Sequence, residues 1–343
     1  MLKTCLLLLL VKMSIQCEVP SFKNNIIVAN GDTPTTISGC ISPDTIGFTS
    51  IFRISAENQA IQDLNHGAVQ GISSKFEIDF HNTSVEIIRE GAFLDLPQLI
   101  RIYFMENELF WISESAFRNL PLLTEVHLEH NKITDVSPRA FNNLPNLTTV
   151  SLERNKLENC DQSWFYKTPV LQSLNLGENR LRKIPRAAFI NLPSIQRLYL
   201  DLNQIEIVDK NAFMGLRNLK RLDLSDNKLK SFEFNFYAPS KLTFVSINNN
   251  NITYISDEVL DVIRPQLSEL IIVDNPLQCA CLEKIIKWSD TFNISVPQWE
   301  FEQSGAVCTV PKRKPSQCLE RGDDDFEEGF WVSFVRERIH VVK

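Results

Sequence analysis

The chain has 343 residues, of which 43% are hydrophobic, and its formal net charge at pH 7 is −7. That composition is enough for a sizeable folded core and argues against an intrinsically disordered chain. The negative charge argues against general binding to nucleic acid or anionic lipid.

The N-terminal segment 1–16 has the pattern of a secretory signal. Lys3 precedes an apolar run from Leu6 to Val11, and small or polar residues follow before Cys17. Such a run is too short to span a bilayer, although a membrane anchor is the alternative. Nothing later in the sequence resembles a transmembrane helix or a hydrophobic tail for a GPI anchor. We therefore expect a secreted, extracellular protein without a membrane span.

From residue 51 onward one apolar pattern recurs at a nearly constant step of roughly 24 residues. One copy reads Leu123, Val126, Leu128, Asn131 and Ile133. The ten copies begin at Ile51, Lys75, Leu99, Leu123, Leu147, Leu171, Ile195, Leu219, Leu242 and Leu267. The step is one position shorter before Leu242 and one position longer after it. This spacing is the signature of leucine-rich repeats, whose units must stack because one unit cannot bury its own apolar face.

The chain resembles the typical, animal-style subclass of these repeats over roughly residues 51–318, because Leu-Pro pairs such as Leu96-Pro97 and Leu120-Pro121 precede many strands. The resemblance implies an α/β fold, a right-handed leucine-rich-repeat solenoid or horseshoe with a parallel concave β-sheet and disulfide-capped ends. It does not by itself imply an activity. The expected organisation is a signal peptide (1–16), an N-terminal cap (17–50), about ten repeats (51–274), a C-terminal cysteine cap (275–318) and an acidic then amphipathic tail (319–343).

Two further columns follow the same step. An asparagine column, with Gln59 and Thr83 in its first two places, is expected to hydrogen-bond the turns that leave the strands. An aromatic column is expected to stack as a core spine rather than form a cofactor-binding or base-stacking box. It comprises Phe93, Phe117, Phe141, Phe165, Phe189 and Phe213, with Val69 before and Tyr237 after them.

Seven cysteines remain after the signal. Four of them, with Trp288, resemble the C-terminal cap of extracellular leucine-rich-repeat proteins. By that resemblance Cys279 pairs with Cys308 and Cys281 with Cys318, although a zinc site is an alternative. Cys17 and Cys40 would make a one-disulfide N-terminal cap, unlike the four-cysteine cap of the small leucine-rich proteoglycans. Cys160 occupies a core column, although an intermolecular bridge is the alternative. We expect a monomer or a weak homodimer.

Four Asn-x-Ser/Thr sequons predict N-glycosylation, at Asn82, Asn146, Asn251 and Asn293.

Outward positions of the strands alternate with the apolar ones and define the candidate binding surface. Thirteen acidic and six basic residues fall at these positions and the turns beside them, which predicts a basic protein partner. Two mixed aromatic and polar patches stand out. The first patch comprises Tyr103, Met105, His127, Glu129 and His130, and the second Arg197, Tyr199, Leu202, Phe244, Ile271 and Val273. The candidate partner-binding residues are Tyr103, Met105, His127, Glu129, Glu153, Arg197, Tyr199, Asp201, Asp223 and Phe244.

The tail contains Arg321-Gly322-Asp323, a tripeptide that resembles the integrin-binding motif, within what is expected to be a solvated acidic spacer. Phe330, Trp331, Phe334, Val335 and Ile339 then recur at near-helical spacing. We expect this helix to pack on the cap, with a dimerising or membrane-surface helix as the alternative.

No catalytic motif is found, and we expect no cofactor and no metal. His81, His127 and His130 near Glu129 come from different columns and make a poor metal site.

Two roles fit: a recognition module for adhesion, signalling or innate immunity, similar to the ectodomains of Toll-like and adhesion receptors, or a structural matrix component of the proteoglycan kind. The acidic outward face and the absence of a four-cysteine N-terminal cap favour recognition.

Overall fold

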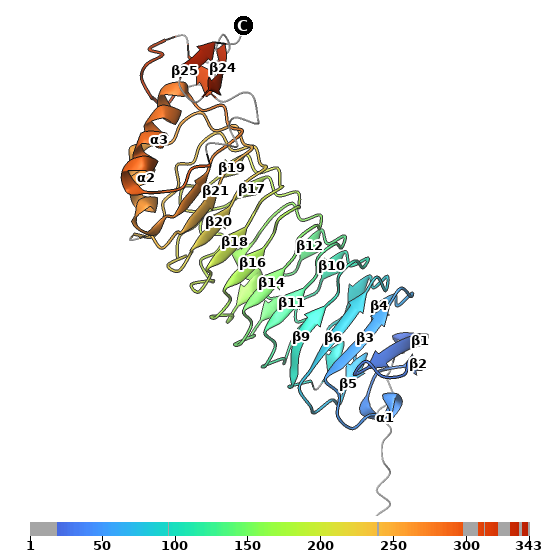
Figure 1. The fold of residues 1–343 in the computed structure, drawn as a ribbon. Coiled ribbons are helices and arrows are strands. Elements are labelled where there is room, and N and C mark those ends of the chain that lie inside the picture. The colour runs from blue at the N-terminus through green and yellow to red at the C-terminus, as the bar shows by residue number, and fades with distance from the viewer. Residues whose placement is uncertain are drawn as a thin grey trace, which may run out of the picture.

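The computed structural model describes residues 19–94, 96–238, 240–297, 308–311, 313–321, 330–335 and 338–341, the last two ranges as backbone only. The chain winds into an elongated, open solenoid whose strands lie side by side along its length (Figure 1). A twelve-stranded main sheet has the order β2-β1-β3-β6-β9-β11-β14-β16-β18-β20-β21-β22. Its ten parallel repeat strands are β3 (Arg53–Glu57), β6 (Phe76–His81), β9 (Leu99–Tyr103), β11 (Glu125–His127), β14 (Thr149–Ser151), β16 (Ser173–Asn175), β18 (Arg197–Tyr199), β20 (Arg221–Asp223), β21 (Phe244–Ser246) and β22 (Glu269–Ile271).

The repeat step sets the register of these strands. Val126 of β11 pairs with Ile102 of β9 and Val150 of β14, each exactly one repeat step away along the chain. All three are buried, whereas their neighbours along each strand point to the opposite side. The side chains on that opposite side form what we call the sheet face. The predicted parallel-sheet solenoid is therefore confirmed, and its core is the continuous stack of inward-facing repeat residues.

The asparagine column forms the predicted buried ladder. In Asn155, Oδ1 accepts from the backbone N–H of Ile133 at 3.0 Å, and Nδ2 donates to the carbonyl oxygen of Leu128 at 2.9 Å. The same pair of bonds recurs from repeat to repeat, for example at Asn179, whose Oδ1 accepts from the N–H of Leu157 at 3.0 Å. Each amide thus satisfies backbone groups of two successive turns, which would otherwise be buried without partners.

Short strands on the other side of the solenoid pair in small parallel sheets. These are β4 (Asp63–Leu64), β7 (Ile87–Ile88), β10 (Trp111–Ile112) and β12 (Asp135–Val136) in one sheet, and β5 (Val69–Gln70) with β8 (Phe93–Leu94), β13 (Phe141–Asn142) with β15 (Phe165–Tyr166), and β17 (Lys183–Ile184) with β19 (Ile207–Val208) in three others. A one-turn helix η1 (Gln162–Trp164) precedes β15.

The aromatic column lies in the core, as predicted. Phe117 stacks on Phe141 at 5.4 Å between ring centroids, and Phe141 stacks on Phe165 at 5.2 Å. The prediction for the last place is wrong. Tyr237 is 45% exposed, and Phe236 stacks on Phe213 instead. The shorter repeat step before Leu242 moves the column back by one position here.

The N-terminal end of the main sheet is covered by an antiparallel hairpin, β1 (Phe22–Ala29) and β2 (Thr35–Gly39), followed by helix α1 (Pro43–Ile46). Strand β1 pairs antiparallel with β3. Gln59 fastens the hairpin to the first repeat, because its Oε1 accepts from the N–H of Ile26 at 2.8 Å and its Nε2 donates to the carbonyl of the same residue. Cys40 is buried and disulfide-bonded, and its predicted partner Cys17 lies outside the described residues, as does the predicted signal.

Helices α2 (Asp257–Ile263) and η2 (Arg264–Gln266) precede the last repeat strand β22, and the C-terminal cap contains α3 (Cys279–Phe292) and β23 (Cys308–Val310). Both predicted disulfides are present, Cys279–Cys308 and Cys281–Cys318, so these cysteines do not form the alternative zinc site. Beyond α3, Ser295 bridges to Glu269 of β22. The cap thereby covers the exposed edge strand, which would otherwise be open to pairing with another chain.

The prediction of a tail helix is wrong. Residues 330–335 form β24 (Phe330–Val335) and residues 338–341 form β25 (Arg338–Val341). Strand β24 pairs antiparallel with β23 of the cap and with β25, giving a three-stranded sheet. The partner strand β23 lies well upstream in the sequence, so local spacing of apolar residues could not reveal it.

Cys160 is the one free cysteine among the described residues, and it is buried in the core as predicted. Burial raises the pKa of its thiol to about 12.

Within the described part of the chain, none of the helices is both long and apolar enough to cross a membrane.

Candidate functional site

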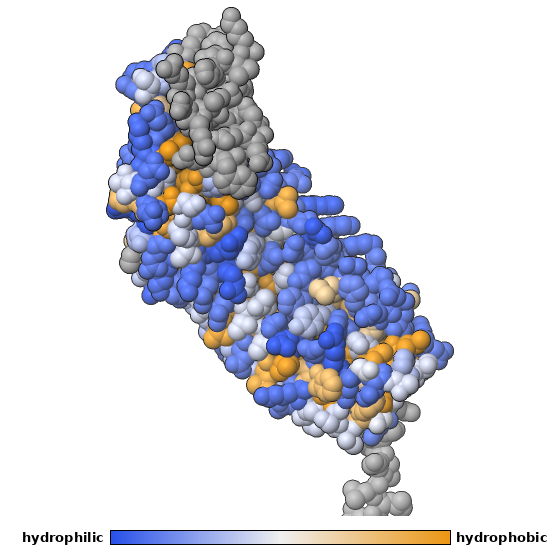
Figure 2. Space-filling view, in the orientation of Figure 1, coloured by the Kyte–Doolittle hydropathy of each residue, from blue (hydrophilic) through white to orange (hydrophobic). Residues whose placement is uncertain are grey.

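All ten candidate binding residues lie on the sheet face or in the turns just beyond its strands, from β9 to β21. Strand pairing places the residues at one repeat position in a row across the sheet, with Tyr103 opposite His127 and Tyr199 opposite Asp223. Residues two positions later in each repeat form the next row, which includes Met105, Glu129, Glu153 and Asp201. Polar residues dominate the visible surface of the central turns, whereas hydrophobic residues appear toward both ends (Figure 2).

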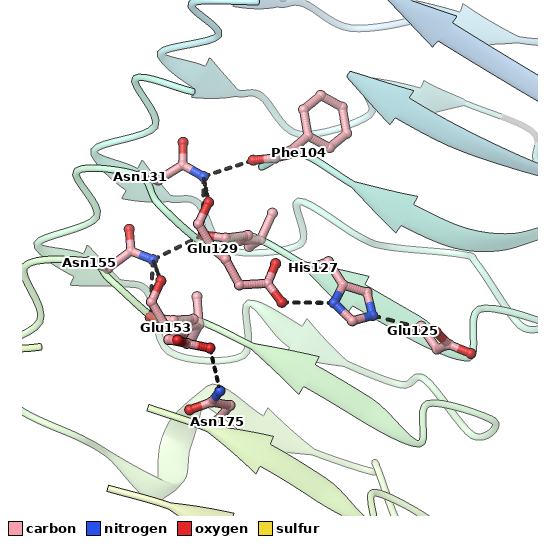
Figure 3. A network of polar contacts seen from close by, with 10 residues as sticks. Phe104, Glu125, His127, Glu129, Asn131, Glu153, Asn155 and Asn175 are labelled. Carbon is pink, nitrogen blue, oxygen red and sulfur yellow. Dashed lines mark hydrogen bonds and ion pairs between the residues drawn. The ribbon is translucent and has the colours of Figure 1, made fainter. Parts of the chain in front are cut away.

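In the first patch, the ring of Tyr103 stacks on the imidazole of His127 at 5.0 Å between centroids. His127 also lies between two carboxylates of its own repeat, Glu125 in β11 and Glu129 just beyond it (Figure 3). Its Nδ1 is 2.8 Å from Oε1 of Glu129, and its Nε2 is 3.4 Å from Oε2 of Glu125. The patch is therefore held in one geometry before any partner arrives.

These contacts set the ionisation of His127. Burial lowers its pKa, but the hydrogen bonds and charges of Glu129 and Glu125 outweigh burial and raise the pKa above its ordinary value. The second oxygen of Glu129, Oε2, is buried without a hydrogen-bond partner. An unpaired carboxylate oxygen of this kind costs stability unless something pairs with it.

Next to this patch lies a group of carboxylates, which we call the acidic cluster: Glu153, Asp201 and Asp223. Glu153 accepts from Nδ2 of Asn175 at 2.8 Å (Figure 3), and Asp201 packs beside Gly177. A side chain at Gly177 would press on Oδ1 of Asp201, so the glycine leaves room for the carboxylate. Burial, and then the charge of Asp223, raise the pKa of Asp201 to about 6.

The basic residues toward the N-terminal half of the sheet face are neutralised by neighbouring strands. Arg53 pairs with Glu77 and Asp79, and Arg101 pairs with Glu77 and Glu125. Such cross-strand pairs leave little local charge. The acidic cluster differs, because Arg221 approaches Asp223 only at 3.9 Å, and no ion pair is formed by Glu153 or Asp201 within the described chain.

The second patch differs from the prediction. Arg221 of the intervening strand lies over Phe244, with its guanidinium carbon 3.5 Å from the ring centroid, and 5.8 Å from that of Tyr199. The arginine thus covers one face of Phe244 while its own Nε is buried without a partner. Val273 was expected on the sheet face but is 4% exposed and belongs to the core cluster. Ile271 also packs partly against the core.

Sequence reasoning missed the contacts that organise the surface: Glu125 on His127, Asn175 on Glu153 and Arg221 on Phe244. Their signal was the register itself: Glu125 is two residues from His127 on β11, whereas Asn175 and Arg221 are each one repeat away from their partners. Arg321 of the integrin-like tripeptide is bound within the cap, donating from Nε to Gln278 at 2.8 Å, while Gly322 and Asp323 lie outside the described residues.

The asparagines of all four sequons are exposed: Asn82, Asn146, Asn251 and Asn293. Their glycosylation stays a prediction. Among the described residues, no group of three or more His, Cys, Asp or Glu side chains is arranged to hold a metal ion.

Comparison with known proteins supports the fold. The Leucine rich repeat family model matches residues 101–157, 145–205 and 196–252. The mouse RP105/MD-1 complex matches with 22% identity and a TM-score of 0.61, covering 71% of this chain and 41% of that chain. The Drosophila Toll–Spatzle complex matches with 22% identity and a TM-score of 0.60, covering 70% and 32%. A TLR13–ssRNA13 complex matches with 25% identity and a TM-score of 0.45, covering 58% and 32%.

This chain therefore spans between about a third and two fifths of the length of those structures. No curated protein matches it in sequence. The family match, the parallel sheet and the asparagine ladder together show that the chain carries a leucine-rich-repeat solenoid with a disulfide-capped C-terminus, similar in fold to RP105 and Toll.

Proposed function

We propose that this protein is an extracellular binding module, rather than an enzyme, and that it recognises a basic protein partner through its sheet face. The observation that carries the proposal is the acidic cluster, whose Glu153 and Asp201 form no close ion pair with a lysine or arginine of the described chain, since the neighbouring Arg154 pairs with Glu178. A partner's lysine or arginine would supply the missing charge, and burial at the interface would strengthen that pairing.

The first patch beside the cluster supplies the other component of a protein-binding surface. Tyr103 and His127 are stacked and partly exposed, and His127 is also held by a hydrogen bond to Glu129, so ordering them on binding costs little conformational entropy. Aromatic residues surrounded by polar groups are frequent energetic centres of protein interfaces. The structures of similar fold, RP105/MD-1 and Toll–Spatzle, are themselves complexes.

The extracellular location rests on the two disulfides of the C-terminal cap, which persist in oxidising compartments. The predicted signal and the four exposed sequons agree with it. We propose a soluble glycoprotein that acts in adhesion, signalling or innate-immune recognition.

The test compares capture of extracellular proteins by three immobilised forms: the wild type, Glu153→Gln with Asp201→Asn, and Glu86→Gln with Glu158→Gln. The last pair removes the same charge from exposed positions outside the main sheet. The wild type and the control should capture the same basic protein, and raising the salt concentration should release it.

Equal capture by all three forms would contradict the proposal. The structural matrix role would be favoured instead by two results together. The Glu153→Gln, Asp201→Asn variant would still capture its partner, and heparin or collagen would bind the protein. Circular dichroism of each variant confirms that a lost partner is not lost folding.

A further inference from the structure

The small sheet formed by β4, β7, β10 and β12 lies away from the sheet face (Figure 1) and carries a hollow of about 650 Å³. Cavities of roughly 300–1,000 Å³ are the usual size for a bound ligand group. Val19, Ile87 and Pro138 contribute apolar wall, together with the indole of Trp111. We call this feature the Trp111 hollow. The function proposed above makes no use of it.

Trp111 stands at a repeat position where the neighbouring turns carry Ile87 and Asp135. It is 39% exposed, so part of its ring is accessible from the solvent. Its Nε1 donates to Oγ of Ser137 at 2.9 Å, so the ring is held in one orientation and its N–H is already satisfied. What Trp111 can offer a ligand is therefore the aromatic ring, not the hydrogen-bond donor.

Two carboxylates line the same hollow. The Glu114 side chain forms no hydrogen bond or ion pair with any described residue, and it is exposed. Glu90 pairs with Arg118 at 3.5 Å, but both side chains are 64% exposed. An ion pair so open to water contributes little and is readily exchanged for another partner.

The basic groups of the hollow are engaged elsewhere. Arg89 pairs with Asp63 at 2.7 Å. The ring of His66 packs over Gly91, with Nδ1 3.3 Å from the carbonyl oxygen of Glu90. Among the charged side chains that line the hollow, Glu114 is thus the one without a hydrogen-bond or ion-pair partner among the described residues. An aromatic ring and an unpaired carboxylate on the wall of one hollow are the complement of an organic cation.

We propose that the Trp111 hollow binds an arginine or lysine side chain of a protein partner, seated against Trp111 and paired with Glu114. A second hollow of about 670 Å³ adjoins it and shares Val19, Asn65 and Arg89 as walls. The two hollows together offer more volume than one side chain fills, which leaves room for neighbouring residues of the partner when its basic residue occupies the Trp111 hollow.

The test uses short peptides, so that it does not depend on the sheet face. The folded protein is labelled with fluorotryptophan, and the Trp111 resonance is assigned from the Trp111→Phe variant. The peptide acetyl-Gly-Gly-Arg-Gly-Gly-amide is titrated alongside the same peptide with citrulline in place of arginine. The arginine peptide should shift the Trp111 resonance saturably, and the citrulline peptide should not. Trp164, which is 5% exposed, serves as the internal reference and should not move.

Glu114→Gln should weaken binding of the arginine peptide about threefold, the size expected for loss of one exposed ion pair. The matched control is Glu108→Gln, since Glu108 pairs with Lys132 and does not line the hollow. Binding to this control should equal that of the wild type.

The proposal is overturned if the arginine peptide leaves Trp111 unshifted, if citrulline acts equally, or if the two glutamate variants weaken binding alike. A shift produced only by an oligosaccharide would overturn it too, and would assign the hollow to a carbohydrate instead. None of these outcomes bears on the acidic cluster, which the capture experiment tests with separate variants.

Discussion

The Nδ1 atom of His127 lies 2.8 Å from Oε1 of Glu129, two residues further along the chain and just beyond the end of β11. The Nε2 atom of the same ring lies 3.4 Å from Oε2 of Glu125. The protonation state of His127 therefore depends on the positions of these two carboxylates. The protonated imidazole donates to both carboxylates, whereas the neutral form can donate to only one.

The first prediction concerns the pH dependence of this contact. The pKa of His127 in the folded protein is raised above its ordinary value of 6.5, so the stabilisation is full below pH 6.5 and is lost as pH rises through the raised pKa. Glu129→Gln should lower the pKa of His127, because it removes the negative charge and leaves the opposing effect of burial. NMR titration of the imidazole protons measures the pKa of His127 in the wild type and in the variant.

Denaturant unfolding provides the companion measurement. The advantage of the wild type over Glu129→Gln should shrink as pH rises above 6.5. An unchanged His127 pKa in the variant would show that Glu129 does not control it.

The second prediction is that Asp201→Asn stabilises the protein at pH 7. Burial and Asp223 raise the pKa of Asp201 from 3.8 to about 6, so its ionisation opposes folding at neutral pH. The side chain is partly exposed and solvent screens the effect, so the expected gain in unfolding free energy is about 1 kcal/mol. The gain should disappear below about pH 4, where the unfolded chain is also protonated.

If the variant is more stable and also loses the partner, the acidic cluster is retained at a cost in stability because it binds. If it is destabilised at pH 7, then Asp201 has a favourable partner and the description of the acidic cluster is wrong.

The third prediction tests the asparagine ladder. Asn155→Ala removes one acceptor and one donor that serve buried backbone groups of Ile133, Leu128 and Leu152. The expected loss is about 3 kcal/mol of unfolding free energy, because buried polar groups are left without partners. Asn191→Ala, at an exposed asparagine that donates to Gln162, should cost less than about 0.5 kcal/mol. Equal losses in the two variants would argue against the ladder as a stabilising feature.

The fourth prediction concerns Cys160. Because the thiol is buried and its pKa is raised to about 12, it should not react with a thiol reagent in the native protein and should react once the protein is unfolded. Non-reducing electrophoresis should show no disulfide-linked dimer. Rapid stoichiometric labelling of the native protein would contradict the core assignment.

The repeats were predictable because one periodic pattern specifies both strand register and core, as Val126 and Asn131 illustrate. The surface was less predictable. Which residues face outward follows from alternation, but Arg221 reaches Phe244 on the next strand through a long, flexible side chain whose rotamer depends on its neighbours. Sequence periodicity carries no information on that choice.

The errors have two physical causes: the shortened repeat step displaced the last place of the aromatic column, and packing that local spacing does not reveal decided the others. Val273 alternates like an exposed residue but is 4% exposed and belongs to the core cluster. The apolar residues from Phe330 to Ile339 fit a helical spacing, yet β24 pairs with β23 of the cap on one side and with β25 on the other. Aromatic and β-branched residues favour strands once a partner strand is available.

The most direct test of the central claim is hydroxyl-radical footprinting of the protein alone and bound to the partner that it captures. Tyr103, Met105, Tyr199 and Phe244 lie on or beside the sheet face, whereas Tyr166 and Tyr237 are exposed outside the main sheet. Our account predicts that the partner protects the first four side chains from oxidation and leaves the two reference tyrosines unchanged. Protection of Tyr166 or Tyr237 without protection of the sheet face would contradict it.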